Sequence, residues 1–159
     1  MAFHTLRASP DTVRIGVFDA RFPPVMQIES GDTVEVQCVS GREEVMPQSG
    51  SDLRVPPELA SILAANPGMR AGHIVTGPIA VAGAEPGDML EIRIKAVTPR
   101  VPYGVNNAGS GGAAADMIPG NARGSYVIKY DPARKVAFFS PEITIRSILP
   151  VIITPSLPR

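Results

Sequence analysis

The 159-residue chain is long enough for one domain, and a domain of that size buries about 68–70% of its unfolded surface without needing disulfides or structural metal. Fifteen basic and fifteen acidic residues give a formal net charge of +0, which excludes an electrostatic case for nucleic acid or an anionic membrane. The single cysteine, Cys38, cannot form an internal disulfide, and the N-terminus lacks the pattern of a signal peptide. We therefore expect a cytoplasmic protein. Because no apolar run approaches the roughly 18 residues of a membrane span, we also expect a soluble one.

The composition favours strands over helices. Seventeen prolines and fifteen glycines are normal for short strands and turns but high for a helical chain. We therefore expect an all-β fold, mainly β with one short helix, arranged as a β-sandwich or a barrel. Apolar periodicity and turn residues predict strands at residues 12–18, 25–28, 31–39, 73–81, 87–97, 125–130, 136–139 and 143–148.

Two similar turns precede two of these strands. ESGD occupies residues 29–32 and EPGD occupies residues 85–88. Proline followed by glycine in the second turn suits type II geometry, since proline restricts φ and glycine accepts a positive φ. We expect Asp32 and Asp88 to close the turns by bonding nearby backbone amides. The shared pattern E-x-G-D-x-[VL]-E-[VI] is either a weak internal duplication or two similar turns entering two strands.

The strands after these turns alternate apolar and polar residues. GDTVEVQCV at 31–39 and GDMLEIRIKAV at 87–97 both have the period of two that marks a half-buried strand. In the second strand, Leu90, Ile92 and Ile94 are predicted to face inward.

One helix and one long loop stand apart from the strands. PELASILAA at 57–65 begins with proline and Glu58 and stops at the NPG of 66–68, which predicts a helix. NNAGSGGAAADMIPGNARG at 106–124 has few packing side chains and is predicted to be a mobile loop. Such a loop in a compact β protein often borders a site.

Few residues point to chemistry on their own. His4 and His73 are far apart and Cys38 has no histidine nearby, so no compact zinc or copper motif is present. Cys38 alternates with inward valines, which favours a small core residue over a nucleophile. His73 opens a strand three residues before Thr76. It is either a structural histidine bonded at the strand end or a metal ligand or proton shuttle.

Four stretches in order resemble the N-terminal half of the acetamidase/formamidase family. They are RIGVFDARFPPVMQIESGDTVEV at 14–36, VPPELASILAA at 55–65, GHIVTGPIAVAGAEPGDMLEIRI at 72–94 and YGVN at 103–106. The resemblance covers about residues 4–146. It implies a β-rich amidohydrolase that releases ammonia from short linear amides such as formamide or acetamide.

The same resemblance implies the site and its partners. His73 matches the histidine before the family's T-G-P motif, which implies a catalytic role as metal ligand or proton carrier. Asp19 and Asn106, in matched segments, would position the substrate. The implied cofactor is a divalent metal, zinc or calcium, with most ligands outside this chain. It implies a small amide and further copies of the chain as partners, and a complementary C-terminal chain is the other possibility. The balanced charge and the lack of a membrane-length apolar run leave neither nucleic acid nor a membrane as an expected partner.

The chain also departs from the family. Arg14-Ile15-Gly16 stands where relatives often carry His-Trp-Gly, and family members are roughly twice as long, with a second half expected to supply most ligands. We expect a β domain at 1–146 and a non-matching tail at 147–159, as in a truncated or frameshifted reading frame or a half-length paralogue. The competing hypothesis is therefore a catalytically inactive β module that acts in binding or assembly.

Overall fold

The computed structural model describes residues 1–42, 46–47, 50–67, 73–108 and 124–146. The chain divides into two compact units, which are described separately below. The first comprises Met1–Arg42 and Val55–Met89, and the second comprises Glu43–Arg54 and Leu90–Arg159. The predicted domain boundary at residue 146 stays a prediction, because the residues after it lie outside the described part.

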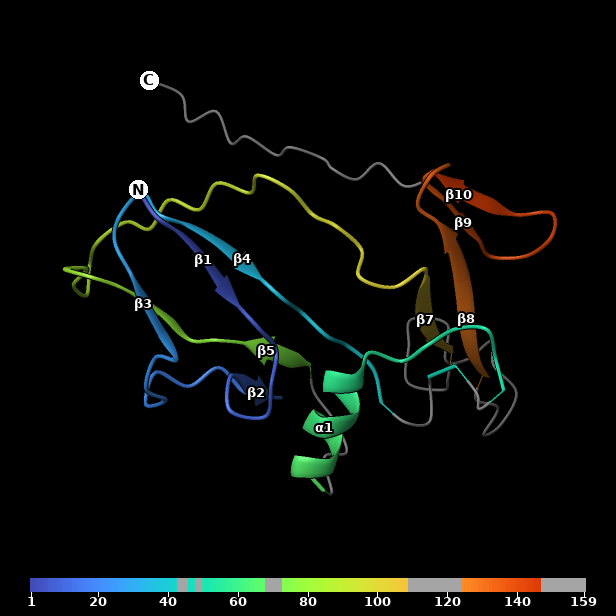
Figure 1. Ribbon diagram of the computed structural model, residues 1–159, viewed down its shortest axis with the longest axis horizontal. Coiled ribbons are helices and arrows are strands. Elements are labelled where there is room, and N and C mark those ends of the chain that lie inside the picture. The colour runs from blue at the N-terminus through green and yellow to red at the C-terminus, as the bar shows by residue number, and fades with distance from the viewer. Residues whose placement is uncertain (43–45, 48–49, 68–72, 109–123, 147–159) are drawn as a thin grey trace, which may run out of the picture. The chain divides into compact units, whose positions relative to one another are not determined.

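The first unit is built from three pairs of short strands (Figure 1). The pairs are β1 (Phe3–Leu6) parallel to β4 (Thr33–Val36), β2 (Val13–Ile15) antiparallel to β5 (Ile74–Thr76), and β3 (Met26–Ile28) parallel to β6 (Ile79–Val81). Each pair joins segments that are distant in sequence. Predicted strand 73–81 is in fact two strands, because the chain bends at Gly77, where φ is +138°, and β5 and β6 pair with different strands.

Helix α1 (Pro57–Ala65) supplies the most buried side chains of the first unit and confirms the predicted helix. It begins with proline and carries Glu58 in its first turn, where an acidic group favours the helix N-terminus. Leu59 and Ile62 are fully buried, and their spacing of three residues places them on one face of the helix. The Asn66 amide donates to the carbonyl of Ile62 at 2.8 Å and so satisfies a carbonyl at the helix end.

The two E-x-G-D turns form as predicted. The backbone N–H of each aspartate donates to the carbonyl of the glutamate three residues earlier, at 3.1 Å in both turns. Gly31 and Gly87 have φ values of +89° and +106°. The carboxylates of Asp32 and Asp88 accept the glutamate N–H at 3.1 and 2.8 Å. Both aspartates therefore close their turns.

The second unit contains one four-stranded antiparallel sheet in the order β10-β9-β8-β7. Its strands are β7 (Tyr103–Ala108), β8 (Gly124–Asp131), β9 (Val136–Phe138) and β10 (Thr144–Arg146). Of the predicted loop 106–124, residues 106–108 belong to β7 and residue 124 to β8, while 109–123 lie outside the described residues. Sequence periodicity missed β7, and it also missed β1 in the first unit.

Two predicted inward patterns are wrong. Residues 87–97 contain no strand, and Leu90, Ile92 and Ile94 are 66%, 71% and 51% exposed. Cys38 is exposed as well, because β4 ends at Val36. Alternation assigns side chains to two faces, but burial requires a partner strand and a packed layer, which local sequence does not reveal.

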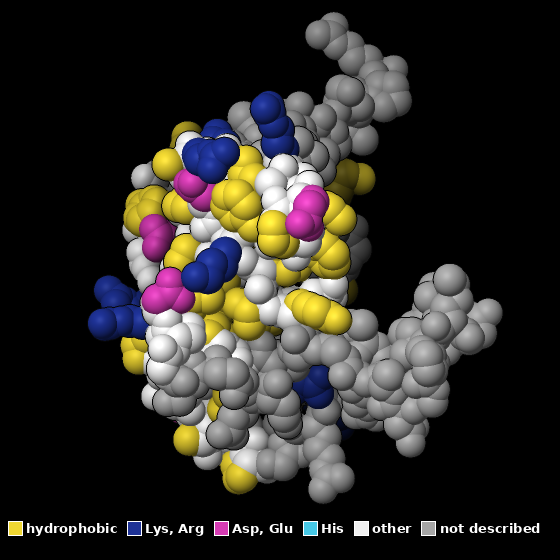
Figure 2. Space-filling model, turned by 90° about the vertical axis from the view of Figure 1, so that its right-hand side faces the viewer, with side chains coloured by type: hydrophobic (Ala, Val, Ile, Leu, Met, Phe, Trp, Pro, Cys, Tyr) yellow, Lys and Arg dark blue, Asp and Glu magenta, His cyan; other side chains and the backbone are white. Residues whose placement is uncertain are grey.

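The prediction of an all-β fold with one short helix is confirmed. The sheets of the described residues are open, which fits the sandwich-like alternative and not a closed barrel. Among the described residues, no helix has the length and apolar character needed to cross a bilayer. On the face shown in Figure 2, acidic and basic side chains are scattered among hydrophobic ones.

Candidate functional site

The antiparallel pair β2 and β5 carries the leading site candidate. His73 directly precedes β5, and its carbonyl accepts the backbone N–H of Gly16 at 2.9 Å. The ladder pairs Arg14 with Val75, so the same register sets Gly16 opposite His73. Opposite residues share a face, and so do alternate residues along a strand. Arg14 and His73 are therefore diagonal neighbours on one face, with the His73 side chain exposed to solvent.

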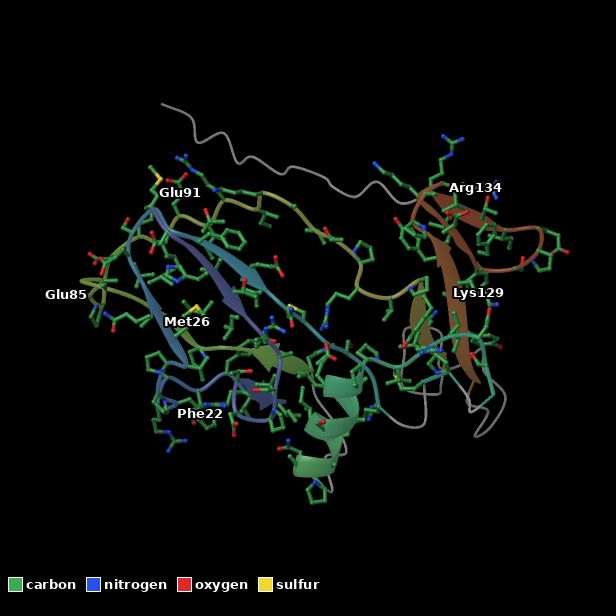
Figure 3. All side chains as sticks on the ribbon, in the orientation of Figure 1. Phe22, Met26, Glu85, Glu91, Lys129 and Arg134 are labelled. Carbon is green, nitrogen blue, oxygen red and sulfur yellow. The ribbon has the colours of Figure 1, made fainter. Side chains whose placement is uncertain are left out.

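Arg14 is held firmly at this position. Its guanidinium carbon lies 4.9 Å from the centre of the Phe22 ring, a cation–π arrangement whose aromatic partner is labelled in Figure 3. Its Nη1 donates to the carbonyls of Val13 at 2.7 Å and Asp11 at 3.2 Å. Its Nε is buried and has no hydrogen-bond partner among the described residues. The site thus has a positive charge held in place and one N–H group without a partner. The sequence identified Arg14 only as part of a departure from the family pattern.

Asp19 is committed to a local ion pair. Its carboxylate accepts from Arg21 Nη2 at 2.6 Å, from Arg21 Nε at 3.0 and 3.1 Å, and from the Arg21 backbone N–H at 2.9 Å. The side-chain hydrogen bond from Arg21 lowers the pKa of Asp19, with a further contribution from the backbone bond, while the carboxylate raises the pKa of Arg21. Asp19 is therefore ionised at neutral pH. A carboxylate that stays ionised and holds Arg21 suits positioning of a substrate better than donation of a proton.

Asn106 belongs to the second unit. It lies on β7 opposite Tyr126 of β8, and its side chain is exposed. Within the described residues of the first unit, no hydrogen bond or ion pair joins the side chains of His73 and Asp19. Their assignment to a common site stays a prediction from the family resemblance.

The residues on this face do not fit a resident metal ion. A catalytic zinc takes three protein ligands and calcium takes six or more oxygens. No group of three or more His, Cys, Asp or Glu side chains suitable for a metal occurs in the described part of the chain. On this face, His73 could supply one ligand at most.

The second histidine has a structural partner. His4 Nε2 lies 2.9 Å from Asp32 Oδ2, and the same carboxylate accepts the Ala2 N–H at 2.6 Å. The Ala2 bond, then the His4 bond and the Glu29 N–H bond, lower the pKa of Asp32 to about 2. Because β1 runs parallel to β4, His4 reaches the turn before β4. This contact fastens the N-terminal strand and is not part of the candidate site.

These observations define a β-rich chain with a histidine and a fixed arginine on one strand pair, and comparison places it in a family. The Acetamidase/Formamidase family model matches residues 16–143. The match covers most of the chain, so the chain belongs to this family.

Two crystal structures share the fold. One is a recombinant predicted acetamidase/formamidase from the thermophile Thermoanaerobacter tengcongensis, with 18% identity, a TM-score of 0.58, and coverage of 92% of this chain and 43% of that chain. The other is an acetamidase from Bacillus halodurans, with 19% identity, a TM-score of 0.57, and coverage of 88% and 42%. This chain therefore spans less than half the length of either. No curated protein matches the sequence significantly.

Proposed function

We propose that this chain contributes to the hydrolysis of carbon–nitrogen bonds in short linear amides such as formamide and acetamide. The observation that carries the proposal is the match to the Acetamidase/Formamidase family over residues 16–143. The shared fold of the two crystal structures is consistent with it.

The chain's own residues suit part of this chemistry. Amide hydrolysis needs a base for the attacking water, donors for the developing oxyanion and an acid for the departing ammonia. In the proposal His73 moves the proton, since its side chain is exposed and an imidazole ring can accept a proton at one nitrogen and donate one from the other. Arg14, on the same face of β2 and β5, supplies positive charge that favours the developing oxyanion. Asp19 helps to position the substrate through Arg21.

The second candidate function is a β module that binds or assembles without catalysis. Leu90, Ile92 and Ile94 are exposed, and an apolar surface of this kind suits an interaction with another chain. The two functions differ in whether the chain alone, or the chain with a complementary C-terminal chain, turns over an amide.

The test is ammonia release from formamide and acetamide by the purified chain, with and without added zinc or calcium. The variants His73→Ala and Arg14→Ala are measured beside Gln27→Ala, an exposed change on β3. If His73 is the proton carrier, His73→Ala lowers kcat by about 10²- to 10⁴-fold, and Gln27→Ala leaves it unchanged.

Two outcomes separate the hypotheses. Turnover that survives His73→Ala contradicts the role of His73. No turnover by the folded chain, either alone or co-expressed with the C-terminal half of a family member, contradicts the amidase proposal and favours the binding module. Far-UV circular dichroism on each sample establishes that the compared proteins are folded.

A further inference from the structure

Residues 90–94, LEIRI, form an exposed alternating segment between β6 and β7. The apolar side chains Leu90, Ile92 and Ile94 are 66%, 71% and 51% exposed. Figure 1 draws the segment as coil, and Figure 3 labels Glu91 on it. Within the described part of the chain, these five residues pair with no strand. Its sequence alternates apolar and polar residues, so its unpaired backbone groups can gain hydrogen bonds by pairing as a strand with another chain.

The segment is complementary in charge to a second, antiparallel copy of itself. Glu91 and Arg93 are separated by two positions, so they share a face, and they form an ion pair at 2.5 Å across exposed side chains. Reading the segment backwards exchanges the acidic and the basic position but keeps the three apolar positions. An antiparallel copy therefore presents a base opposite each acid, whereas a parallel copy in register would set Glu91 against Glu91.

We infer that residues 90–94 are a self-association surface, in which two copies of the chain pair as antiparallel strands centred on Ile92. In this register Leu90 lies opposite Ile94 of the other copy, Ile92 lies opposite Ile92, and Glu91 lies opposite Arg93. Directly opposite residues point to the same side. Six apolar side chains therefore gather on one face of the pair, and four charges form two ion pairs on the other. The two-fold symmetry closes the interface at a dimer.

A second copy fits this surface better than it fits β10, one edge strand of the second unit's sheet. The formal net charge of +0 means that two copies do not repel each other overall. Strand β10, at the edge of the second unit's sheet, has the sequence TIR. Pairing two copies of β10 about Ile145 would set Arg146 opposite Thr144 and form no ion pair. The inference does not depend on amidase activity.

A charge-swap experiment tests the pairing. Association of the wild type, Glu91→Arg, Arg93→Glu and the double variant is measured by sedimentation velocity over a range of concentrations. Each single change sets like charges opposite one another at two symmetric positions, so the dimer dissociation constant should rise by about tenfold. The double variant restores opposite charges and should recover the wild-type constant. Both side chains are exposed, and circular dichroism verifies that all four proteins fold.

A cross-linking experiment tests the register in the same chain. Cys38 is the single cysteine, so Cys38→Ser gives a background without thiols. In that background, Ile92→Cys should form a disulfide-linked dimer under mild oxidation, since the two positions face each other. Leu90→Cys is the matched control, because its counterpart across the pair is position 94 and the two introduced thiols lie far apart.

Several results would overturn the inference. A wild type that stays monomeric at every concentration excludes self-association. If the single changes leave association unaffected, or if the double variant does not recover it, then the interface lies on another surface or the segment binds a different partner chain. Equal cross-linking of the two cysteine variants excludes the proposed register.

Discussion

Asp32 offers a quantitative test of how the first unit holds its N-terminal strand. Its carboxylate accepts the N–H of Ala2 at 2.6 Å and of Glu29 at 3.1 Å, and it contacts His4 Nε2 at 2.9 Å. Asp88, in the equivalent turn, accepts one described hydrogen bond, at 2.8 Å. Asp32→Ala removes three such bonds and Asp88→Ala removes one. If each hydrogen bond contributes a similar free energy, the loss in unfolding free energy should be roughly three times larger for Asp32→Ala than for Asp88→Ala.

The pH dependence provides a second measure of the same contact. Hydrogen bonds, led by that from Ala2, lower the folded-state pKa of Asp32 from 3.8 to about 2. A lowered folded-state pKa means that the carboxylate stabilises the fold fully above its unfolded pKa and loses this effect as the pH falls through about 2. The difference in unfolding free energy between wild type and Asp32→Ala should therefore shrink as the pH falls from about 4 toward 2.

Urea unfolding followed by far-UV circular dichroism measures both effects, with Asp88→Ala as the internal control. The chain has no tryptophan, so a backbone signal is the better probe. Equal losses for the two variants would refute the reasoning that Asp32 fastens β1 in addition to closing its turn. A difference between wild type and Asp32→Ala that persists unchanged to pH 2 would refute the assigned pKa.

Three further changes test the core, a turn and a buried hydroxyl. Leu59→Ala should lower the unfolding free energy by about 2–5 kcal/mol in urea titrations, because Leu59 is fully buried, whereas half-buried Leu63→Ala should cost less. Gly77→Ala should cost about 1–3 kcal/mol by the same assay, since φ is +138°, and an unchanged stability would contradict that conformation. Tyr103→Phe removes the bond from its hydroxyl to the Arg54 carbonyl at 3.3 Å and should cost about 0.5–1.5 kcal/mol. Burial raises the pKa of Tyr103 above 10.0, so an ultraviolet titration of wild type should show a late-ionising tyrosine that is absent from the variant.

Features that depend on near neighbours could be predicted from the sequence. The two E-x-G-D turns form because glycine accepts a positive φ and aspartate bonds the amide three residues earlier. Helix α1 begins at its proline and ends near Asn66 for equally local reasons. Membership of the Acetamidase/Formamidase family, matched at residues 16–143, could likewise be read from ordered motifs.

Strand partners and exposure depended on the tertiary structure. Periodicity cannot reveal that β2 pairs with β5, so Arg14 was not predicted as a neighbour of His73. The same signal predicted Leu90, Ile92 and Ile94 to be buried, yet they are exposed. The physical reason is that alternation sorts side chains between two faces, while burial and proximity arise only when a distant strand supplies the other half of the ladder. By itself the sequence determined the turns, the helix and the family, and the pairing of distant strands decided which residues share a face.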